Sequence, residues 1–125
     1  MKIFYFLLIL VSSEALGKTF IFGSCLNQNK PQVILNVIQE NKADKIIFMG
    51  DNVYGNTKNN IENLKNAYSK AKVNLAPFNK HEILAIWDDH DYGENDGGSD
   101  FVHKHESKEL FLNFWGIPKN DPRWK

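Results

Sequence analysis

The chain has 125 residues, of which 42% are hydrophobic and 13% aromatic, and its 15 Lys and Arg residues are balanced by 15 Asp and Glu residues. This length and apolar content predict a single folded domain and exclude a disordered chain. A net charge of zero excludes a nucleic-acid-binding protein that depends on a strongly basic surface.

The N-terminal segment has the pattern of a secretory signal. Lys2 is followed by the apolar run Ile3–Val11, and small residues stand at Ala15 and Gly17. A basic start, a short apolar stretch and a small-residue cleavage site predict a signal peptide over residues 1–17. The run is shorter than the roughly 20 residues of a membrane span. We therefore expect a secreted, periplasmic or cell-envelope protein with no stable membrane span after cleavage; a buried N-terminal strand and a retained lipid-facing anchor are the alternatives.

Apolar runs and helical spacings alternate along the rest of the chain. Three short apolar runs predict buried strands at residues 19–22, 45–49 and 83–87. Pro31 suits the first position of a helix. The residues expected on one face of that helix are Val33, Ile34, Val37 and Ile38.

Two further helices are predicted from apolar spacing. The first carries Ile61, Leu64, Tyr68, Ala71 and Leu75 at spacings of three and four, and Pro77 ends it. The last is short and carries Leu110, Phe111, Phe114 and Trp115. The order β-α-β-α-β-loop-α predicts an α/β fold with a largely parallel sheet.

Each predicted strand leads directly into a polar cluster. The clusters are Gly23–Cys25, Gly50–Tyr54 and Asp88–Asp91. Ligands of parallel α/β sheets bind beyond the carboxyl ends of the strands, where neighbouring clusters meet. A thiol, carboxylates, a phenol, an amide and an imidazole are together a set of metal ligands.

Taken singly, most of these residues have an ordinary structural explanation. Cys25 is the only cysteine, and it is a buried thiol, an intermolecular partner or a ligand. Asp51 is typical of a turn, Tyr54 of a half-buried packing residue, and His90 of a surface imidazole. The three carboxylates within Asp88–Asp91 are different, because they repel one another unless a cation or protons intervene.

Acidic residues are concentrated after the third predicted strand. Between Asp88 and Asp100 there are six acidic residues and no Lys or Arg. Such a run is typical of a solvated loop or of a cation site. A calcium-binding EF-hand loop fits poorly, because Gly93 stands where an oxygen ligand is required. A glycosidase with two carboxylates would not explain Cys25 and Tyr54.

Together, the clusters resemble the PhoD-type alkaline phosphatase and phosphodiesterase family, which is related to the calcineurin-like metallophosphatases. The matching segments are Phe22–Cys25, Gly50–Gly55, Ile86–Gly93 with Asn95–Asp96, Phe111–Trp115 with Pro118, and Asp121–Arg123. The spacing of Asp51 and Tyr54 is also similar to that of purple acid phosphatases. The resemblance covers nearly all of residues 19–125 and implies a metallophosphatase-type sandwich.

The resemblance implies a role for each residue of the clusters. Cys25 and Tyr54 would bind Fe³⁺ as thiolate and phenolate, and Asp51 would bridge the iron and a divalent ion such as Ca²⁺. Asp89 stands where relatives carry an Asn ligand, and Asn95 is a further, weaker candidate. His90 would contact the phosphoryl group or the leaving oxygen.

The expected activity is metal-dependent hydrolysis of small phosphate mono- or diesters, without an organic cofactor and without specific nucleic-acid binding. Members of the family are longer and supply further metal ligands from their second half. Residues 18–125 therefore resemble the N-terminal portion of the domain, and we expect this portion alone to be essentially inactive. The alternatives are a catalytically inactive secreted protein that still binds calcium or another metal, and a small interaction domain. The sequence makes no prediction of oligomeric state.

Overall fold

The computed structural model describes residues 17–58, 60–78 and 82–125. The predicted signal peptide lies outside these residues except for Gly17. An export assignment for residues 1–17 therefore stays a prediction, to be tested by N-terminal sequencing of the mature protein.

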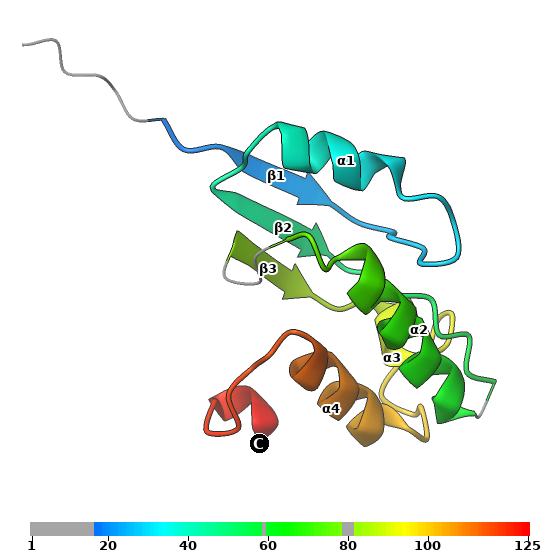
Figure 1. Ribbon diagram of the computed structural model, residues 1–125. Coiled ribbons are helices and arrows are strands. Elements are labelled where there is room, and N and C mark those ends of the chain that lie inside the picture. The colour runs from blue at the N-terminus through cyan, green and yellow to red at the C-terminus, as the bar shows by residue number, and fades with distance from the viewer. Residues whose placement is uncertain (1–16, 59, 79–81) are drawn as a thin grey trace, which may run out of the picture.

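The described strands form one parallel sheet. Strands β1 (Phe20–Gly23), β2 (Lys45–Met49) and β3 (Ile83–Ile86) lie in the order β1-β2-β3. Ile21 pairs with Ile46, and Phe48 pairs with Ala85. All three strands point the same way in Figure 1, so their carboxyl ends share one edge of the sheet. The predicted α/β fold with a parallel sheet is confirmed.

Helix α1 (Val33–Glu40) joins β1 to β2 and differs from the prediction. It begins at Val33, and Pro31 lies just before the helix-capping residue. The predicted apolar face was wrong for Val33, Ile34 and Val37, which are exposed, and right for Ile38, which is buried; Leu35 is buried as well. Nearly every residue in the first six positions of this helix is apolar, so the pattern could not specify which stripe faces the core.

Helix α2 (Ile61–Asn74) joins β2 to β3 and follows the predicted pattern. Leu64, Tyr68 and Ala71 are buried at spacings of four and three residues. The Asn60 side chain accepts the Glu62 backbone N–H, which satisfies one of the free donors at the helix start.

Helix α4 (Lys104–Phe114) begins earlier than predicted and packs against α2. Phe111 and Leu112 are buried, and the Tyr68 and Phe114 ring centroids lie 4.9 Å apart. The 3-10 helix η2 (Pro122–Trp124) returns to α4, and the Trp124 indole N–H donates to the Ile117 carbonyl oxygen over 3.2 Å. This contact closes the C-terminal turn onto the helix layer.

The described core lies on one face of the sheet. Ile46, Phe48 and Ile83 pack with Leu35 and Ile38 of α1 in one buried cluster. A second cluster joins α2 and α4, and partly buried Ala85 of β3 contacts both clusters. The opposite sheet face carries exposed apolar side chains, namely Phe20, Phe22, Met49, Leu84 and Ile86. Parallel sheets are usually covered on both faces, and the described helices supply this cover on one face only.

Candidate metal centre

The loops after the three strands are joined at the carboxyl edge of the sheet. The Cys25 backbone N–H donates to the Gly50 carbonyl oxygen over 3.3 Å, and the Leu26 N–H donates to the Asp51 carbonyl oxygen over 2.8 Å. The first two loops are therefore neighbours, as the parallel order requires.

The loop after β2 turns through two consecutive residues with positive φ. Gly50 has φ 94° and Asp51 has φ 53°. Asp is among the residues that tolerate this left-handed conformation. A Cβ atom at Gly50 would lie only 2.7 Å from the Cβ atom of Asp88. Glycine thus lets the loop that carries Asp51 pass directly against the loop after β3.

The two oxygen atoms of the Asp51 carboxylate lie in different surroundings. Its Oδ2 atom accepts a hydrogen bond from the Tyr54 hydroxyl over 3.1 Å and lies 3.7 Å from the Cys25 sulfur. Its Oδ1 atom is buried, and no hydrogen-bond partner for it lies among the described residues. A buried carboxylate oxygen without a donor is unfavourable unless a cation or water contacts it.

Asp89 and His90 are supplied by α3 (Asp89–Tyr92), a single helical turn in a segment predicted as a loop. A reciprocal capping arrangement between Asp88 and Asp91 begins this turn. The Asp89 carboxylate accepts the backbone N–H of His90 over 2.8 Å and that of Asp96 over 2.5 Å. These bonds fix the direction of the Asp89 side chain.

The His90 ring lies against Tyr54. Their ring centroids are 4.2 Å apart with an interplanar angle of 37°. The His90 Nδ1 atom is buried, and within the described part of the chain no hydrogen-bond partner contacts it. It is thus a second buried polar atom at this site with no protein partner.

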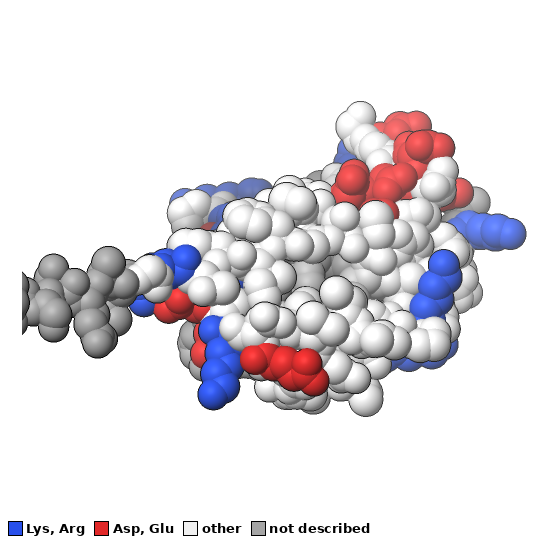
Figure 2. All heavy atoms as spheres, turned by 90° about the horizontal axis from the view of Figure 1, so that it is seen from above, with Lys and Arg blue, Asp and Glu red and all other residues white. Residues whose placement is uncertain are grey.

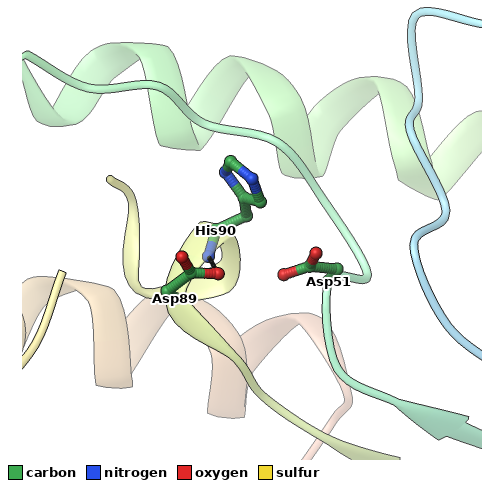
Figure 3. A group of neighbouring side chains, drawn as sticks. All are labelled: Asp51, Asp89 and His90. Atoms are coloured by element: carbon green, nitrogen blue, oxygen red, sulfur yellow. Dashed lines mark hydrogen bonds between the residues drawn. The ribbon is translucent and has the colours of Figure 1, made fainter. Parts of the chain in front are cut away.

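Asp51, Asp89 and His90 form a compact group of metal-ligand atoms. One atom from each residue lies within 4.8 Å of the others. Figure 3 shows the two carboxylates facing each other, with the imidazole beside the gap between them. Two facing carboxylates repel when both are ionised, and a cation between them would relieve the repulsion and contact the unpartnered atoms. The residues therefore fit a metal ion.

The pKa values near the site follow from burial and hydrogen bonding. A hydrogen bond from the Asp96 backbone N–H holds the pKa of Asp89 below its ordinary value, and the His90 backbone N–H adds a smaller effect in the same direction. The Asp89 anion is therefore favoured. Burial raises the pKa of Tyr54, and hydrogen bonding with Cys25 and Asp51 adds to the effect.

Figure 2 shows acidic side chains gathered at one end of the molecule, the end where α3 lies in Figure 1.

The structure brings together five of the six residues selected from the sequence. They are Cys25, Asp51, Tyr54, Asp89 and His90. Cys25 is exposed, so the interpretation of this residue as a buried thiol was wrong. Asn95 is exposed as well, and its side-chain amide donates to the Asp96 carboxylate over 2.6 Å.

Two buried residues of the polar clusters were given no role from the sequence. Asn52 and Asp91 are 1% and 0% exposed and hydrogen-bond to each other across the two loops. The signal available for Asp91 was its spacing of three from Asp88, which is that of a helix-capping pair. Asn52 carried no separate signal, because an Asn after an Asp in a turn is common.

Fold and site together define an α/β protein with a candidate metal centre at the carboxyl edge of its parallel sheet. Comparison of the chain with models of protein families, with curated proteins and with solved structures gave no match. Among the described helices, none has the length and apolar character to cross a membrane.

Proposed function

We propose that this chain carries part of the catalytic centre of a metal-dependent phosphoesterase that hydrolyses small phosphate mono- or diesters. The observation that supports this most is the group of Asp51, Asp89 and His90, in which the buried atoms Asp51 Oδ1 and His90 Nδ1 have no hydrogen-bond partner among the described residues. The position of the group beyond the carboxyl ends of parallel strands is where α/β enzymes bind substrates. The resemblance to PhoD-type phosphatases adds the reaction class.

We assign two ions to the two edges of Asp51. Cys25 and Tyr54 lie on the Oδ2 side, where thiolate and phenolate would hold Fe³⁺. Asp89 would hold a divalent ion such as Ca²⁺ with Asp51, and Asn95 belongs to this second set as a weaker candidate. Carboxylate oxygens suit hard cations of both kinds. Bound ions would supply positive charge against the phosphate oxygens and activate water for attack.

The protein side chains have separate tasks in this proposal. His90, held against the Tyr54 ring, contacts the phosphoryl group and donates a hydrogen bond or a proton toward the leaving oxygen. Arg123, the only arginine of the chain, already forms hydrogen bonds with Asp121. This chain therefore cannot bind the phosphate through several guanidinium groups, and in this proposal metal ions balance the charge of the substrate.

A second candidate function is metal binding without catalysis. The acidic segment Asp88–Asp100 and the unpartnered Asp51 Oδ1 and His90 Nδ1 atoms favour the binding of a cation, whether or not a substrate is hydrolysed. A third, a small interaction domain, is favoured by the uncovered apolar face of the sheet. Binding of a metal and hydrolysis of an ester therefore have to be measured separately.

The test uses the full chain loaded with iron and calcium. Its visible spectrum is recorded, because a ferric phenolate or thiolate absorbs visible light, and a chromogenic phosphodiester and a monoester are assayed from neutral to alkaline pH. Ferric colour supports the phosphoesterase centre, and metal-dependent turnover would show in addition that this chain suffices for hydrolysis. A rise in melting temperature with calcium but without ferric colour supports metal binding alone, because a ligand stabilises the state that it binds. No colour, turnover or stabilisation would contradict both metal-based functions.

A further inference from the structure

Asp91 is a buried acidic residue to which the proposed reaction gives no task. Its side chain is 0% exposed, although it lies directly after His90. Burial raises its pKa to about 6, even though amide hydrogen bonds from Asp88 and Asn52 favour the anion. Burying a carboxyl group away from water lowers the stability of the fold unless hydrogen bonds compensate for the lost hydration. The hydrogen bonds of Asp91 are therefore its main structural contribution.

The bonds of Asp91 join the two loops that carry the metal-facing side chains. The Asn52 backbone N–H lies 3.0 and 3.1 Å from the two Asp91 oxygens, and the Asn52 side-chain amide donates to Oδ2 over 3.0 Å. Oδ2 also accepts the Asp88 backbone N–H over 3.1 Å. The Asn52 amide completes the link by donating to the Ile86 carbonyl oxygen over 2.8 Å.

The two side chains that form this network each follow a residue of the candidate metal centre. Asn52 follows Asp51, and Asp91 follows His90. The network therefore fixes the backbone beside Asp51 to the short helix that carries Asp89 and His90. Hydrogen bonds from outside the ligand set are what normally orient metal-binding side chains.

We propose that Asp91, together with Asn52, is a positioning residue that sets the separation between the Asp51 carboxylate and the Asp89–His90 pair. The inference rests on the proposed function in one respect, that this group of side chains holds a metal. A carboxylate suits the position because all the groups that hydrogen-bond to it among the described residues are N–H donors, whereas an Asn at position 91 would turn an N–H₂ group toward some of them.

The first measurement compares the Mn²⁺ affinities of Asp91→Asn and Asp100→Asn by titration calorimetry. Asp100 is exposed and belongs to the same acidic segment, so its variant removes the same charge without touching the network. We expect Asp91→Asn to weaken Mn²⁺ binding about 10–100-fold, the usual effect of losing a residue that orients ligands. Equal affinities for the two variants would overturn the proposal, whatever the melting temperature of Asp91→Asn.

A double-mutant cycle separates positioning from a general loss of charge. In a chain that already carries Asp89→Ala, which has no ligand atom at position 89, the group that Asp91 positions is incomplete. We therefore expect Asp91→Asn to add less than about a 3-fold further loss of Mn²⁺ affinity in that background, because coupled residues are non-additive. A further loss as large as in the unmodified chain means that Asp91 acts independently of the site and overturns the proposal.

Asn52→Ala covers the case in which Asp91→Asn does not fold. It removes the side-chain amide but keeps the backbone N–H that Asp91 accepts. We expect it to weaken Mn²⁺ binding in the same direction as Asp91→Asn and by a smaller factor. Unchanged affinity in a folded Asn52→Ala chain would contradict the shared role of the two residues.

Amide NMR shifts of the ion-free protein keep the test independent of the proposed function. Failure of the unmodified chain to bind Mn²⁺ contradicts the metal site itself. The amide signals of Asp51, Asp89 and His90 then decide whether the network fixes the two loops. They must shift together in Asp91→Asn or Asn52→Ala and stay in place in Asp100→Asn. Unshifted signals in the first two variants would overturn the positioning role.

Discussion

At the residue scale, Asp51 combines an unusual backbone conformation with a divided environment. Its φ of 53° lies in the left-handed region. Its Oδ2 atom accepts the Tyr54 hydroxyl, whereas its buried Oδ1 atom has no hydrogen-bond partner among the described residues. An Asn at this position tolerates the same φ, so a charge-removing substitution here tests chemistry and leaves the fold intact.

We predict that Asp51→Asn abolishes phosphoesterase activity and lowers the metal content of the complete enzyme. A neutral amide replaces the carboxylate that faces both proposed ions, so both are held less tightly. Metal analysis and an ester hydrolysis assay measure the effect. Asp44→Asn is the control, since Asp44 is an exposed residue paired with Lys18 far from the group. Activity of Asp51→Asn within a few-fold of the parent would exclude the bridging role.

We predict that His90→Ala lowers turnover by about 10²–10⁴-fold, the range for a positioned proton donor, while most of the metal stays bound. The division of roles is open to direct test, because a ring nitrogen of His90 lies within 4.8 Å of the two carboxylates. Kinetics and metal analysis are done on the same samples, with the exposed His105→Ala as the control. Loss of metal together with activity would make His90 a ligand.

At the element scale, the approach of the loop after β2 to the loop after β3 depends on a glycine. Gly50 has φ 94° and leaves no room for a side chain against Asp88, whereas Gly116 has φ 69° and nothing within 4 Å of an added Cβ atom. The two positions share a positive φ and differ in the space around them.

We predict that Gly50→Ala lowers the free energy of unfolding by about 1–3 kcal/mol more than Gly116→Ala, the usual cost of overpacking. Chemical denaturation of the two variants measures the difference. The strain of a positive φ is common to both, so the excess reports the contact with Asp88. Equal losses would show that the two loops do not pack as closely as described.

The 3-10 helix η2 offers a prediction about pH. Arg123 holds the pKa of Asp121 at about 2, below its ordinary value of 3.8, chiefly through side-chain hydrogen bonds. A lowered pKa stabilises the fold above the ordinary value, and this stabilisation is lost as the pH falls toward 2. Side-chain carboxyl NMR should give a midpoint near 2, and Arg123→Gln should move it toward 3.8. A midpoint that does not change in the variant would contradict the pairing.

At the scale of the whole molecule, the described helices cover one face of the sheet and leave the other open. Phe22 and Ile86 on the open face are each 60% exposed. Contiguous exposed apolar side chains of this kind favour association and dye binding. In Figure 1, α1 lies next to β1, and α4 and η2 lie beyond β3.

We predict that the full chain binds a hydrophobic dye and associates as its concentration rises, and that Phe22→Lys and Ile86→Lys reduce both effects. Val73→Lys is the control, since Val73 is 73% exposed but lies on helix α2. Dye fluorescence and sedimentation are the measurements. If the chain stays monomeric at high concentration and does not increase the fluorescence of the dye, this face of the sheet is covered in solution.

Sequence patterns alone predicted the three strands, the three longer helices and the sheet edge at which the loops meet, but not the helical turn α3. Three apolar runs and the spacing of Leu64, Tyr68 and Ala71 were sufficient for the order of strands and helices, because burial imposes a period of two or 3.6 on the residues. Parallel order then required the polar ends of the strands to meet, and Cys25 and Asp51 do lie side by side.

Tertiary packing determines the features that the hydrophobic periodicity of the sequence does not specify. The uniformly apolar start of α1 allowed either stripe to face inward, and the packing of Leu35 and Ile38 against β2 selected one. The open sheet face, the left-handed conformation of Asp51 and the link between Asn52 and Asp91 follow from contacts between residues far apart in the chain. Such contacts depend on how whole helices and strands pack against one another, and local sequence patterns do not specify that packing.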